Sequence, residues 1–201
     1  MLSRLLLATT NRGKIRELVR LFEGSGVELL LPERELDVEE KGGSFFENAY
    51  LKAKAYYEAF RMPTLGEDSG LVVPALEGYP GIYSSRFYSL EWGGVEPLEG
   101  SRDRANIRKL LRLMEGLQDR KAYFLTCAVV CLDNAGLWAE GRCYGEVLRE
   151  PRGEGGFGYD PIFQPEGYTK SMAELRPEEK DLLSHRGKAI RRLLELLKML
   201  K

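Results

Sequence analysis

Hydrophobic positions along the first part of the chain follow two different periods, which predicts alternating strands and helices. Apolar runs at residues 4–9 and 27–31 are typical of buried strands. Apolar residues at helical spacing over 13–23 and 45–60 predict two helices, and Ser44 begins a capping-box pattern before the second one. This order favours a fold in which helices cover a sheet.

The rest of the chain continues this pattern with longer strands. Residues 71–73 indicate a short apolar strand, and residues from about 102 to 117 indicate an amphipathic helix. Two strands at 121–132 and 137–148 flank a turn sequence, which favours a hairpin, and a last amphipathic helix begins at about Gly187. Together these elements predict an α/β or α+β fold on a mixed sheet.

Composition and charge narrow the class of protein. The chain has 201 residues, of which 43% are apolar and 30% charged, as is typical of a soluble globular protein. The net charge of -1 gives no electrostatic reason to expect a nucleic-acid partner. The N-terminal apolar run is too short for a signal peptide or a membrane span. We therefore expect a cytoplasmic protein with no membrane partner.

The three cysteines also favour a cytoplasmic protein, in which thiols stay reduced. Cys127, Cys131 and Cys143 lie in apolar or alternating surroundings and lack the paired spacing of a zinc site. We interpret them as reduced core residues.

A first candidate for chemistry is the segment Thr9-Thr10-Asn11-Arg12-Gly13-Lys14, between a predicted strand and a predicted helix. The free N–H groups and partial positive charge of a helix N-terminus attract phosphate. Arg12 and Lys14 lie where cations are normally unfavourable, and a bound polyanion would reverse that effect. A solvated turn explains the same residues, and both interpretations stay open.

A second candidate is acidic. Adjacent carboxylates in Glu67-Asp68-Ser69-Gly70, ahead of the predicted strand at 71–73, could hold a hard cation and activate water. The pair Glu39-Glu40 could supply another carboxylate to the same ion. The alternatives are a β-turn for the first group and a solvated loop for the second.

Lys52 is a third candidate because its helix offers it no partner. Its neighbours one turn away are Asn48, Ala49, Ala55 and Tyr56, and none of them is acidic. Lys52 is therefore either a solvated surface lysine or a second phosphate-binding cation.

Two later segments could bind a purine base. The loop at 155–161 combines glycines, which allow a ligand to approach the backbone, with Phe157 and Tyr159, which offer π-faces. Further along, Lys180 precedes the segment 184–187, which places cations at the start of the last helix. A flexible hairpin exit and a surface helix start are the alternatives.

These segments, in this order, closely resemble the inosine triphosphatase family, whose members hydrolyse faulty purine nucleoside triphosphates. The matching stretches are residues 8–14, 44–49, 52–53, 68–71, 80–87, 156–163 and 184–187. The resemblance covers nearly the whole chain. It implies an α/β fold in which an elongated mixed β-sheet and flanking helices form two lobes around a central cleft, within one domain over residues 1–201.

The resemblance also implies an activity. Members of this family convert ITP, dITP and XTP to the monophosphate and pyrophosphate with Mg²⁺ as cofactor, and they usually form homodimers. By this likeness Asp68 would hold Mg²⁺ and act as the base for water, and one or both of Glu39 and Glu40 would share the metal. Ser69 would contact the substrate.

The same likeness divides the other site residues into two groups. The triphosphate would be held by Thr9, Thr10, Asn11, Arg12, Gly13, Lys14 and Lys52. The base would be surrounded by Phe157, Gly158, Tyr159, Asp160, Lys180, His185 and Arg186. Residues such as Lys180 and Arg186 would donate hydrogen bonds to the 6-oxo group of inosine or xanthine, whereas the 6-amino group of adenine would face a donor.

One residue departs from the family pattern, since many bacterial relatives have Asp where this chain has Glu67. The departure concerns the metal geometry at that position and not the assignment of Asp68. Three rival interpretations remain: a Maf-like pyrophosphatase for modified pyrimidine triphosphates, a nucleotide-binding regulator without catalysis, and a nucleic-acid-binding module.

Overall fold

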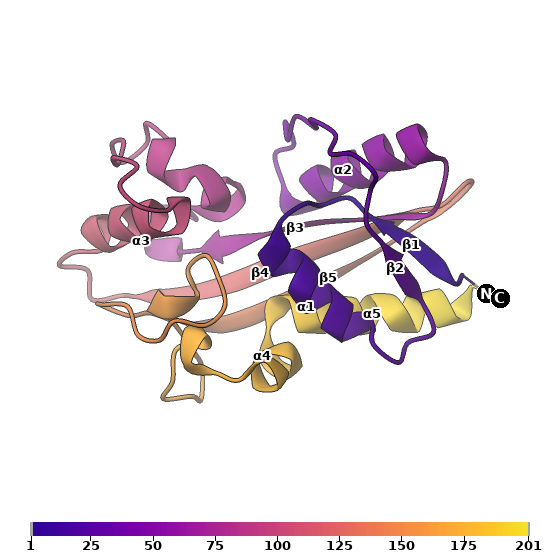
Figure 1. Ribbon diagram of the computed structural model, residues 1–201. Helices are drawn as coiled ribbons and strands as arrows, with labels where there is room; N and C mark the ends of the chain where they lie inside the picture. Colours follow the sequence, from indigo (N-terminus) through magenta and orange to yellow (C-terminus); the bar gives the residue numbers. More distant parts are fainter. Residues whose placement is uncertain (1, 201) are drawn as a thin grey trace. The chain divides into compact units, whose positions relative to one another are not determined.

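The structure is a computed structural model that describes residues 2–200, and it has a mixed α/β fold (Figure 1). Within these residues six strands form one sheet in the order β2-β1-β3-β4-β5-β6. Strand β1 pairs in parallel with β2 and β3, whereas β5 pairs antiparallel with β6, so the sheet is mixed. The strands are β1 (Arg4–Leu7), β2 (Glu28–Leu30), β3 (Thr64–Val72), β4 (Lys121–Cys131), β5 (Gly136–Val147) and β6 (Phe163–Pro165). The α-helices are α1 (Arg12–Phe22), α2 (Phe45–Phe60), α3 (Arg102–Leu113), α4 (Pro177–Leu183) and α5 (His185–Met199). The fold-class prediction of a mixed α/β sheet is confirmed.

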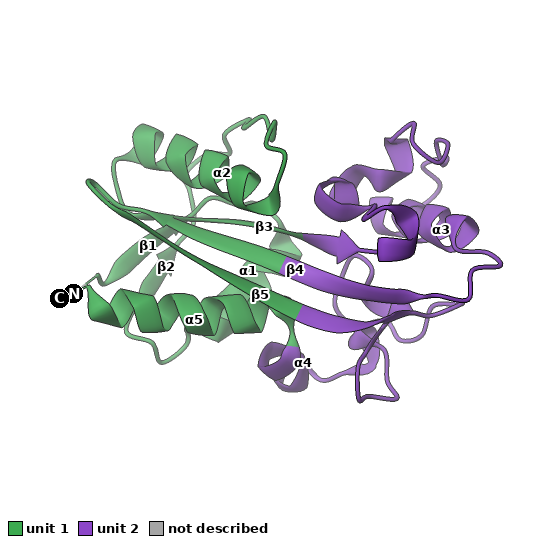
Figure 2. Ribbon diagram, turned by 180° about the vertical axis from the view of Figure 1, so that it is seen from behind, with its two compact units in different colours: residues 1–69, 126–142, 184–201 green, residues 70–125, 143–183 purple. Residues whose placement is uncertain are grey.

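The chain forms two compact units, shown in Figure 2. Unit 1 contains residues 1–69, 126–142 and 184–201, and unit 2 contains residues 70–125 and 143–183. Each unit has a hydrophobic core of its own. The single two-lobed domain expected from the resemblance stays a prediction.

In unit 1, strand β1 is buried on both faces, which explains its continuous apolar sequence. Alternate residues of a strand point to opposite faces. Leu5 and Leu7 accordingly join one core cluster with residues of α1 and α5, whereas Leu6 and Ala8 join another with Tyr56 of α2. Figure 1 shows α1 and α5 on one face of these strands and α2 on the other.

The core of unit 2 is built from strand ends, α3 and the segments that follow β5. Its largest fully buried side chains include Phe87, Leu110, Met114 and Phe163. The rings of Phe124 and Phe163 meet edge to face, with their centroids 4.6 Å apart. This core includes Ile107 and Leu110 of α3 and Tyr159 of the glycine-rich loop after β5.

Strand β3 differs from the sequence prediction in a way that matters for function. It begins at Thr64 rather than at residue 71, so Glu67, Asp68 and Ser69 lie within a strand rather than ahead of one. The sequence did not predict the first part of this strand because residues 66–70 are glycines, acids and a serine, which are typical of turns. The charges are tolerated there because cations from other elements pair with them.

Helix starts follow the expected capping chemistry. The side chains of Ser44, Ser101 and Ser184 accept hydrogen bonds from backbone N–H groups in the first turns of α2, α3 and α5. At α2 the reciprocal half of the capping box is shifted by one residue. The Glu47 carboxylate accepts from the backbone N of Gly43 at 2.6 Å, which fixes the loop before the helix.

Three elements differ from the sequence prediction. Helix α3 ends at Leu113 rather than at about residue 117, and α4 and β6 were not predicted. The three cysteines are buried and free, as expected. Over residues 2–200, no helix has the length and apolar character needed to span a membrane.

Candidate active site

The start of α1 holds the first predicted site segment in a capped turn. The Asn11 side chain accepts a 3.0 Å hydrogen bond from the backbone N of Lys14, and Thr9 Oγ1 accepts from the backbone N of Asn11 at 3.2 Å. Thr10 donates to Glu35 at 2.6 Å, and Arg12 is exposed. This cap fixes the first turn and leaves Lys14 as its half-buried cation.

Consecutive positions in β3 send two carboxylates to opposite faces of the strand. Glu67 Oε2 lies 3.2 Å from Lys14 Nζ of α1, and Glu67 Oε1 lies 3.0 Å from Arg186 of α5. Asp68 Oδ1 lies 3.6 Å from Lys52 Nζ of α2. The period of two in a strand and the helices on either face therefore account for two separate ion-pair groups.

Arg186 forms the centre of the first group. Its guanidinium is fully buried and pairs with Glu17 of α1 and with Glu67, and it donates to Ser69 Oγ at 2.8 Å. Burial opposes the charge, but Glu67 and Glu17 outweigh it and raise the pKa of Arg186 above its ordinary value. A buried cation stays charged only with such partners.

The other members of this group are shifted in the directions expected from their surroundings. Burial opposes ionisation of Glu67, yet Arg186, Lys14 and Lys52 together lower its pKa. The pKa of Lys14 is also lowered. Burial is the main cause of this shift, and the charge of Glu67 opposes it. Glu67 is thus a permanent anion near neutral pH.

The second group contains Lys52 between two carboxylates. Lys52 Nζ lies 2.8 Å from Glu40 Oε1 in addition to its contact with Asp68. Burial opposes the ammonium charge, but Asp68 and Glu40 raise the pKa of Lys52. Its side chain is only 13% exposed, so the solvated-surface interpretation of this lysine is wrong.

Asp68 differs from Glu67 in the direction of its pKa shift. Burial raises its pKa, Lys52 and Lys14 oppose the shift, and Glu40 and Glu67 add to it. Its Oδ2 atom is buried and accepts no hydrogen bond from the residues that the structure describes. A buried carboxylate oxygen without such a bond has lone pairs for a proton, a water molecule or a cation.

The structure separates Glu39 from Glu40. Glu40 pairs with Lys52 and its side chain is 24% exposed, whereas Glu39 pairs with Lys41 at 2.8 Å and is 74% exposed. The loop that carries them is tied to α2 by a 2.8 Å hydrogen bond from Gly42 N to the Asn48 side chain. Of the two, Glu40 is brought together with Asp68.

Gly66 explains how β3 comes close enough to α2 for these contacts. A Cβ at Gly66 would lie 2.3 Å from the carbonyl oxygen of Ala49 and 2.7 Å from the backbone N of Ala53. Only glycine permits this approach of a strand to a helix backbone. Gly66 lies two residues before Asp68, on the face of β3 that meets the helix bearing Lys52.

The donor set suits a hard cation with few protein ligands. Between residues 2 and 200, no group of three or more His, Cys, Asp or Glu side chains could hold a metal ion. Mg²⁺ commonly uses one or two carboxylates, with water and substrate phosphates as its other ligands. Asp68, with its unbonded buried oxygen, and the neighbouring Glu40 fit that mode.

In unit 2 the glycine-rich loop closes around Asp160. Asp160 Oδ2 accepts from Lys180 Nζ at 2.6 Å and from the backbone N of Phe157 at 3.0 Å. Lys180 Nζ also lies 5.1 Å from the centre of the Phe157 ring. At Gly156, with φ +68°, a Cβ would lie 2.0 Å from Asp160 Oδ2, so the turn requires glycine. The structure therefore brings together Phe157, Asp160 and Lys180.

Most of the residues predicted to surround the base are buried, namely Tyr159, Asp160, Lys180, His185 and Arg186. The Tyr159 ring is 4% exposed and its hydroxyl donates to the Ser84 carbonyl oxygen at 2.7 Å, so it is a core residue and not an open stacking face. His185 is also buried, at the first position of α5. The close packing of Gly141 against the His185 carbonyl oxygen, 2.0 Å from an ideal Cβ, fixes that helix start.

Sequence reasoning missed Glu17 and Thr126, which belong to the Glu67 group. Glu17 pairs with Arg186, and Thr126 donates to Glu67 at 3.5 Å. The available signal for Glu17 was its spacing of three residues from Lys14, which places both on one face of a helix. Nothing in the sequence marks Thr126.

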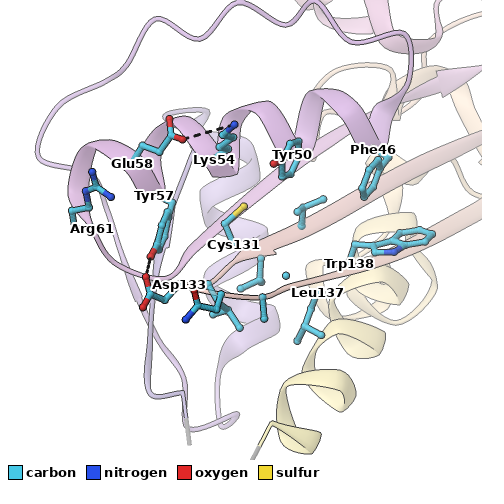
Figure 3. Close-up of a pocket in the computed structure, with 16 residues that line it drawn as sticks. Phe46, Tyr50, Lys54, Tyr57, Glu58, Arg61, Cys131, Asp133, Leu137 and Trp138 are labelled. Atoms are coloured by element: carbon cyan, nitrogen blue, oxygen red, sulfur yellow. Dashed lines mark hydrogen bonds and ion pairs between the residues drawn. The ribbon is translucent and has the colours of Figure 1, made fainter.

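A separate hollow in unit 1 lies between α2 and the β4–β5 hairpin (Figure 3). Its volume is about 590 Å³, and none of the predicted site residues lines it. Phe46, Tyr50 and Trp138 give it an aromatic end, and Tyr57 donates to Asp133 at 2.8 Å at the other. Its walls lack the paired carboxylates and buried lysines of the β3 groups.

Comparisons with known proteins agree in sequence and in structure. The model of the Ham1 family matches residues 5–196. A dITP/XTP pyrophosphatase from Aquifex aeolicus is 55% identical over 195 residues, covering 97% of this chain and 96% of the relative. The Ham1 protein from Staphylococcus aureus has a TM-score of 0.82 at 37% identity and covers 98% of this chain and 100% of its own. A HAM1 protein from Coxiella burnetii has a TM-score of 0.82 at 35% identity, with coverage of 99% and 100%.

Proposed function

This chain belongs to the Ham1 family, and we propose that it is a hydrolase that converts ITP, dITP and XTP to the monophosphate and pyrophosphate. Relatives that match nearly the whole chain are named dITP/XTP pyrophosphatases. The observation that carries the proposal is the position of Asp68, a buried acid with an unbonded oxygen beside Lys52 and Glu40. That arrangement suits the hydrolysis of a phosphoanhydride bond in a highly charged triphosphate.

Cations around β3 and α1 would offset the charge of the triphosphate. The side chains of Lys14 and Lys52 are both largely buried, at 14% and 13% exposed, and Arg12 is exposed at the start of α1. The first backbone N–H groups of α1 add partial positive charge. Preorganised donors of this kind favour the charge that develops on phosphoryl oxygens and on the leaving pyrophosphate. Thr9, Thr10, Asn11 and Gly13 would shape the turn that presents them.

Asp68 would act on water. The raised pKa of its buried carboxyl group makes it a stronger base than an exposed aspartate. Lys52 holds the carboxylate from one side, and Oδ2 stays available to accept a proton from the attacking water. The water would attack the α-phosphorus, and the proton would pass to Asp68.

Asp68 and Glu40 are the residues that would hold Mg²⁺. The ion would supply charge neutralisation and polarise phosphoryl oxygens. Glu39 faces Lys41 at the surface, and we assign it no ligand role. The buried Glu67 pairs with Lys14 and Arg186 instead, which gives the departure from the family pattern a structural function.

In unit 2 we propose that the loop around Asp160 binds the purine base. Phe157 is half-buried and offers a ring, and Lys180 is a donor for a 6-oxo group. Gly158 and Asp160 shape the loop, and Tyr159 anchors it through Ser84. His185 and Arg186 stay proposed base contacts, although Arg186 already donates to Glu17, Glu67 and Ser69, the residue we expect to contact substrate.

A substrate panel tests this function. Purified protein with Mg²⁺ is given ITP, XTP, dITP, GTP, ATP and the pyrimidine triphosphates separately, and pyrophosphate is measured against free phosphate. Rapid pyrophosphate release from ITP and XTP, and slow release from ATP and GTP, is the expected result. Turnover of pyrimidine triphosphates alone would favour the Maf-like activity, and no turnover at all would favour a regulator without catalysis.

The bond that breaks can be tested separately. Hydrolysis of ITP in ¹⁸O-labelled water is expected to place the label in the monophosphate, because water attacks the α-phosphorus. Label in pyrophosphate would contradict that step.

We also propose that the protein is a cytoplasmic homodimer that binds neither nucleic acid nor membranes. The exposed aromatic side chains Phe46, Tyr50 and Trp138 are the kind of surface that protein partners cover. Light scattering after size exclusion should give twice the mass of 22.8 kDa. A titration with DNA and RNA should show no salt-dependent binding.

A further inference from the structure

Asp103, in the first turn of α3, touches the loop that we propose for base binding. Its Oδ2 accepts a 2.8 Å hydrogen bond from the backbone N of Gly158, and both residues belong to unit 2. A carboxylate in the first turn is stabilised by the helix dipole. A hydrogen bond from a backbone amide to an ionised acceptor is stronger than a neutral one.

Two consecutive backbone amides of the loop, those of Phe157 and Gly158, each donate to a carboxylate. The backbone N of Phe157 donates to Asp160 Oδ2 at 3.0 Å, and the next amide, that of Gly158, donates to Asp103. Gly158 has φ +61°, a conformation that suits glycine. Carboxylates therefore hold the backbone on both sides of Phe157, and they fix the point from which its side chain leaves the loop.

Helix α3 is itself anchored, so it can serve as a rigid frame. One turn after Asp103, the buried Asn106 accepts from the backbone N of Tyr88 at 2.7 Å and donates to the Ser85 carbonyl oxygen at 3.3 Å. Lys109 donates to the Phe87 carbonyl oxygen at 2.9 Å. Residues at this spacing share one face of a helix. This side of α3 thus holds both the 3₁₀-helical segment Gly81–Ser89 and the loop that contains Gly158, which belong to unit 2.

We propose that Asp103 is a positioning residue that supports purine binding through the Gly158 amide and the Phe157 ring. This inference rests on the proposed function in that Phe157 is taken to stack on the purine. Asp103 does not touch the base in this account. It orients the backbone that carries the stacking ring, so its loss would weaken substrate binding more than the chemical step.

The test compares three variants of the full-length protein. Asp103→Ala removes the acceptor, and Asp103→Asn keeps an acceptor oxygen of similar shape. Ser101→Ala is the matched control, because it removes the N-cap of the same helix turn, where Ser101 accepts from Arg104 N at 3.2 Å, without touching Gly158. Each is measured by amide exchange at Gly158 without nucleotide, and by KM and kcat for ITP and GTP.

For Asp103→Ala we expect Gly158 exchange and the KM for ITP each to rise by about tenfold, the loss expected for one charge-assisted hydrogen bond, with kcat within about twofold. The KM for GTP should rise in parallel, because an aromatic ring stacks on either purine. Asp103→Asn should restore most of both properties. Ser101→Ala should lower thermal stability but leave KM and Gly158 exchange unchanged.

The two readouts separate failure of this inference from failure of the proposed function. If the wild-type protein releases no pyrophosphate from ITP, the proposed function fails, and Gly158 exchange alone decides whether Asp103 holds the loop. Unchanged exchange in Asp103→Ala would overturn the contact. Faster exchange with unchanged KM, or an equal rise in KM for Ser101→Ala, would overturn the positioning role.

Discussion

Glu67 and Asp68 are neighbours in β3, yet their carboxylates belong to different ion-pair groups. Glu67 meets Lys14 and Arg186 on one face of the strand, and Asp68 meets Lys52 on the other. The strand geometry gives the two acids different roles: the pKa of Glu67 is lowered and the pKa of Asp68 is raised. Divergent pKa shifts in one site are a mark of acid–base chemistry.

The separation of the two glutamates predicts which one binds the metal. Glu40→Gln should raise the Mg²⁺ concentration for half-maximal activity by about tenfold or more, because it removes a carboxylate beside Asp68. Glu39→Gln is the matched control and should behave as wild type, since Glu39 faces Lys41 at the surface. Magnesium titrations of ITP hydrolysis compare the two, and an effect confined to Glu39→Gln would contradict the assignment.

The Glu17–Arg186 pair predicts a large effect on stability. Arg186→Met removes the cation shared by the buried Glu17 and Glu67, which typically costs about 3–5 kcal/mol, whereas Glu17→Gln should cost less because Arg186 keeps Glu67. The double variant should lose less than the sum of the single losses. Arg4→Met breaks the exposed pair with Glu28 and should cost at most about 1 kcal/mol. Urea unfolding measures all four, and additive losses would contradict direct pairing.

Arg186 also allows a test of base selection. Arg186→Ala should reduce kcat/KM for ITP far more than for ATP if its guanidinium reads the 6-oxo group. Equal losses on both substrates would assign Arg186 to holding Glu67 and Ser69 alone. The measurement is kcat/KM on each triphosphate at saturating Mg²⁺.

The pKa of Asp68 predicts the pH dependence of activity. A base must be deprotonated, so activity is lost as pH falls through its pKa. Because burial raises that pKa, the acidic limb of kcat/KM should lie above the range of an ordinary aspartate. Lys52 lowers the pKa of Asp68, so Lys52→Met should move the limb to higher pH. Lys54→Met, on the same helix but half-exposed, should leave it in place. A limb that does not move in Lys52→Met would contradict the assignment.

Much of this structure could be predicted from the sequence because most of its helices and strands follow local patterns of hydrophobic and polar residues. Helix α2 spans the residues predicted for it, and Lys52, which has no acid near it within that helix, pairs with Glu40 and Asp68 from other elements. Serine caps at α2 and α5 were also predictable, since they depend on a single side chain and the following turn.

What the sequence could not show depends on contacts between distant segments. Glu67 and Asp68 had the composition of a turn, and the cation that stabilises Glu67 in the strand, Arg186, lies 119 positions away. The choice between Glu39 and Glu40 depends on a loop held by Gly42 and Asn48, which no local pattern encodes.

Pyrophosphate release from ITP by wild type and Asp68→Asn tests the central claim most directly. The wild-type protein should release pyrophosphate from ITP rapidly in Mg²⁺, and Asp68→Asn should be slower by about 10²–10⁴-fold, the usual contribution of a general base. Its folding should stay intact, as checked by circular dichroism. A folded Asp68→Asn protein with wild-type turnover would contradict the account.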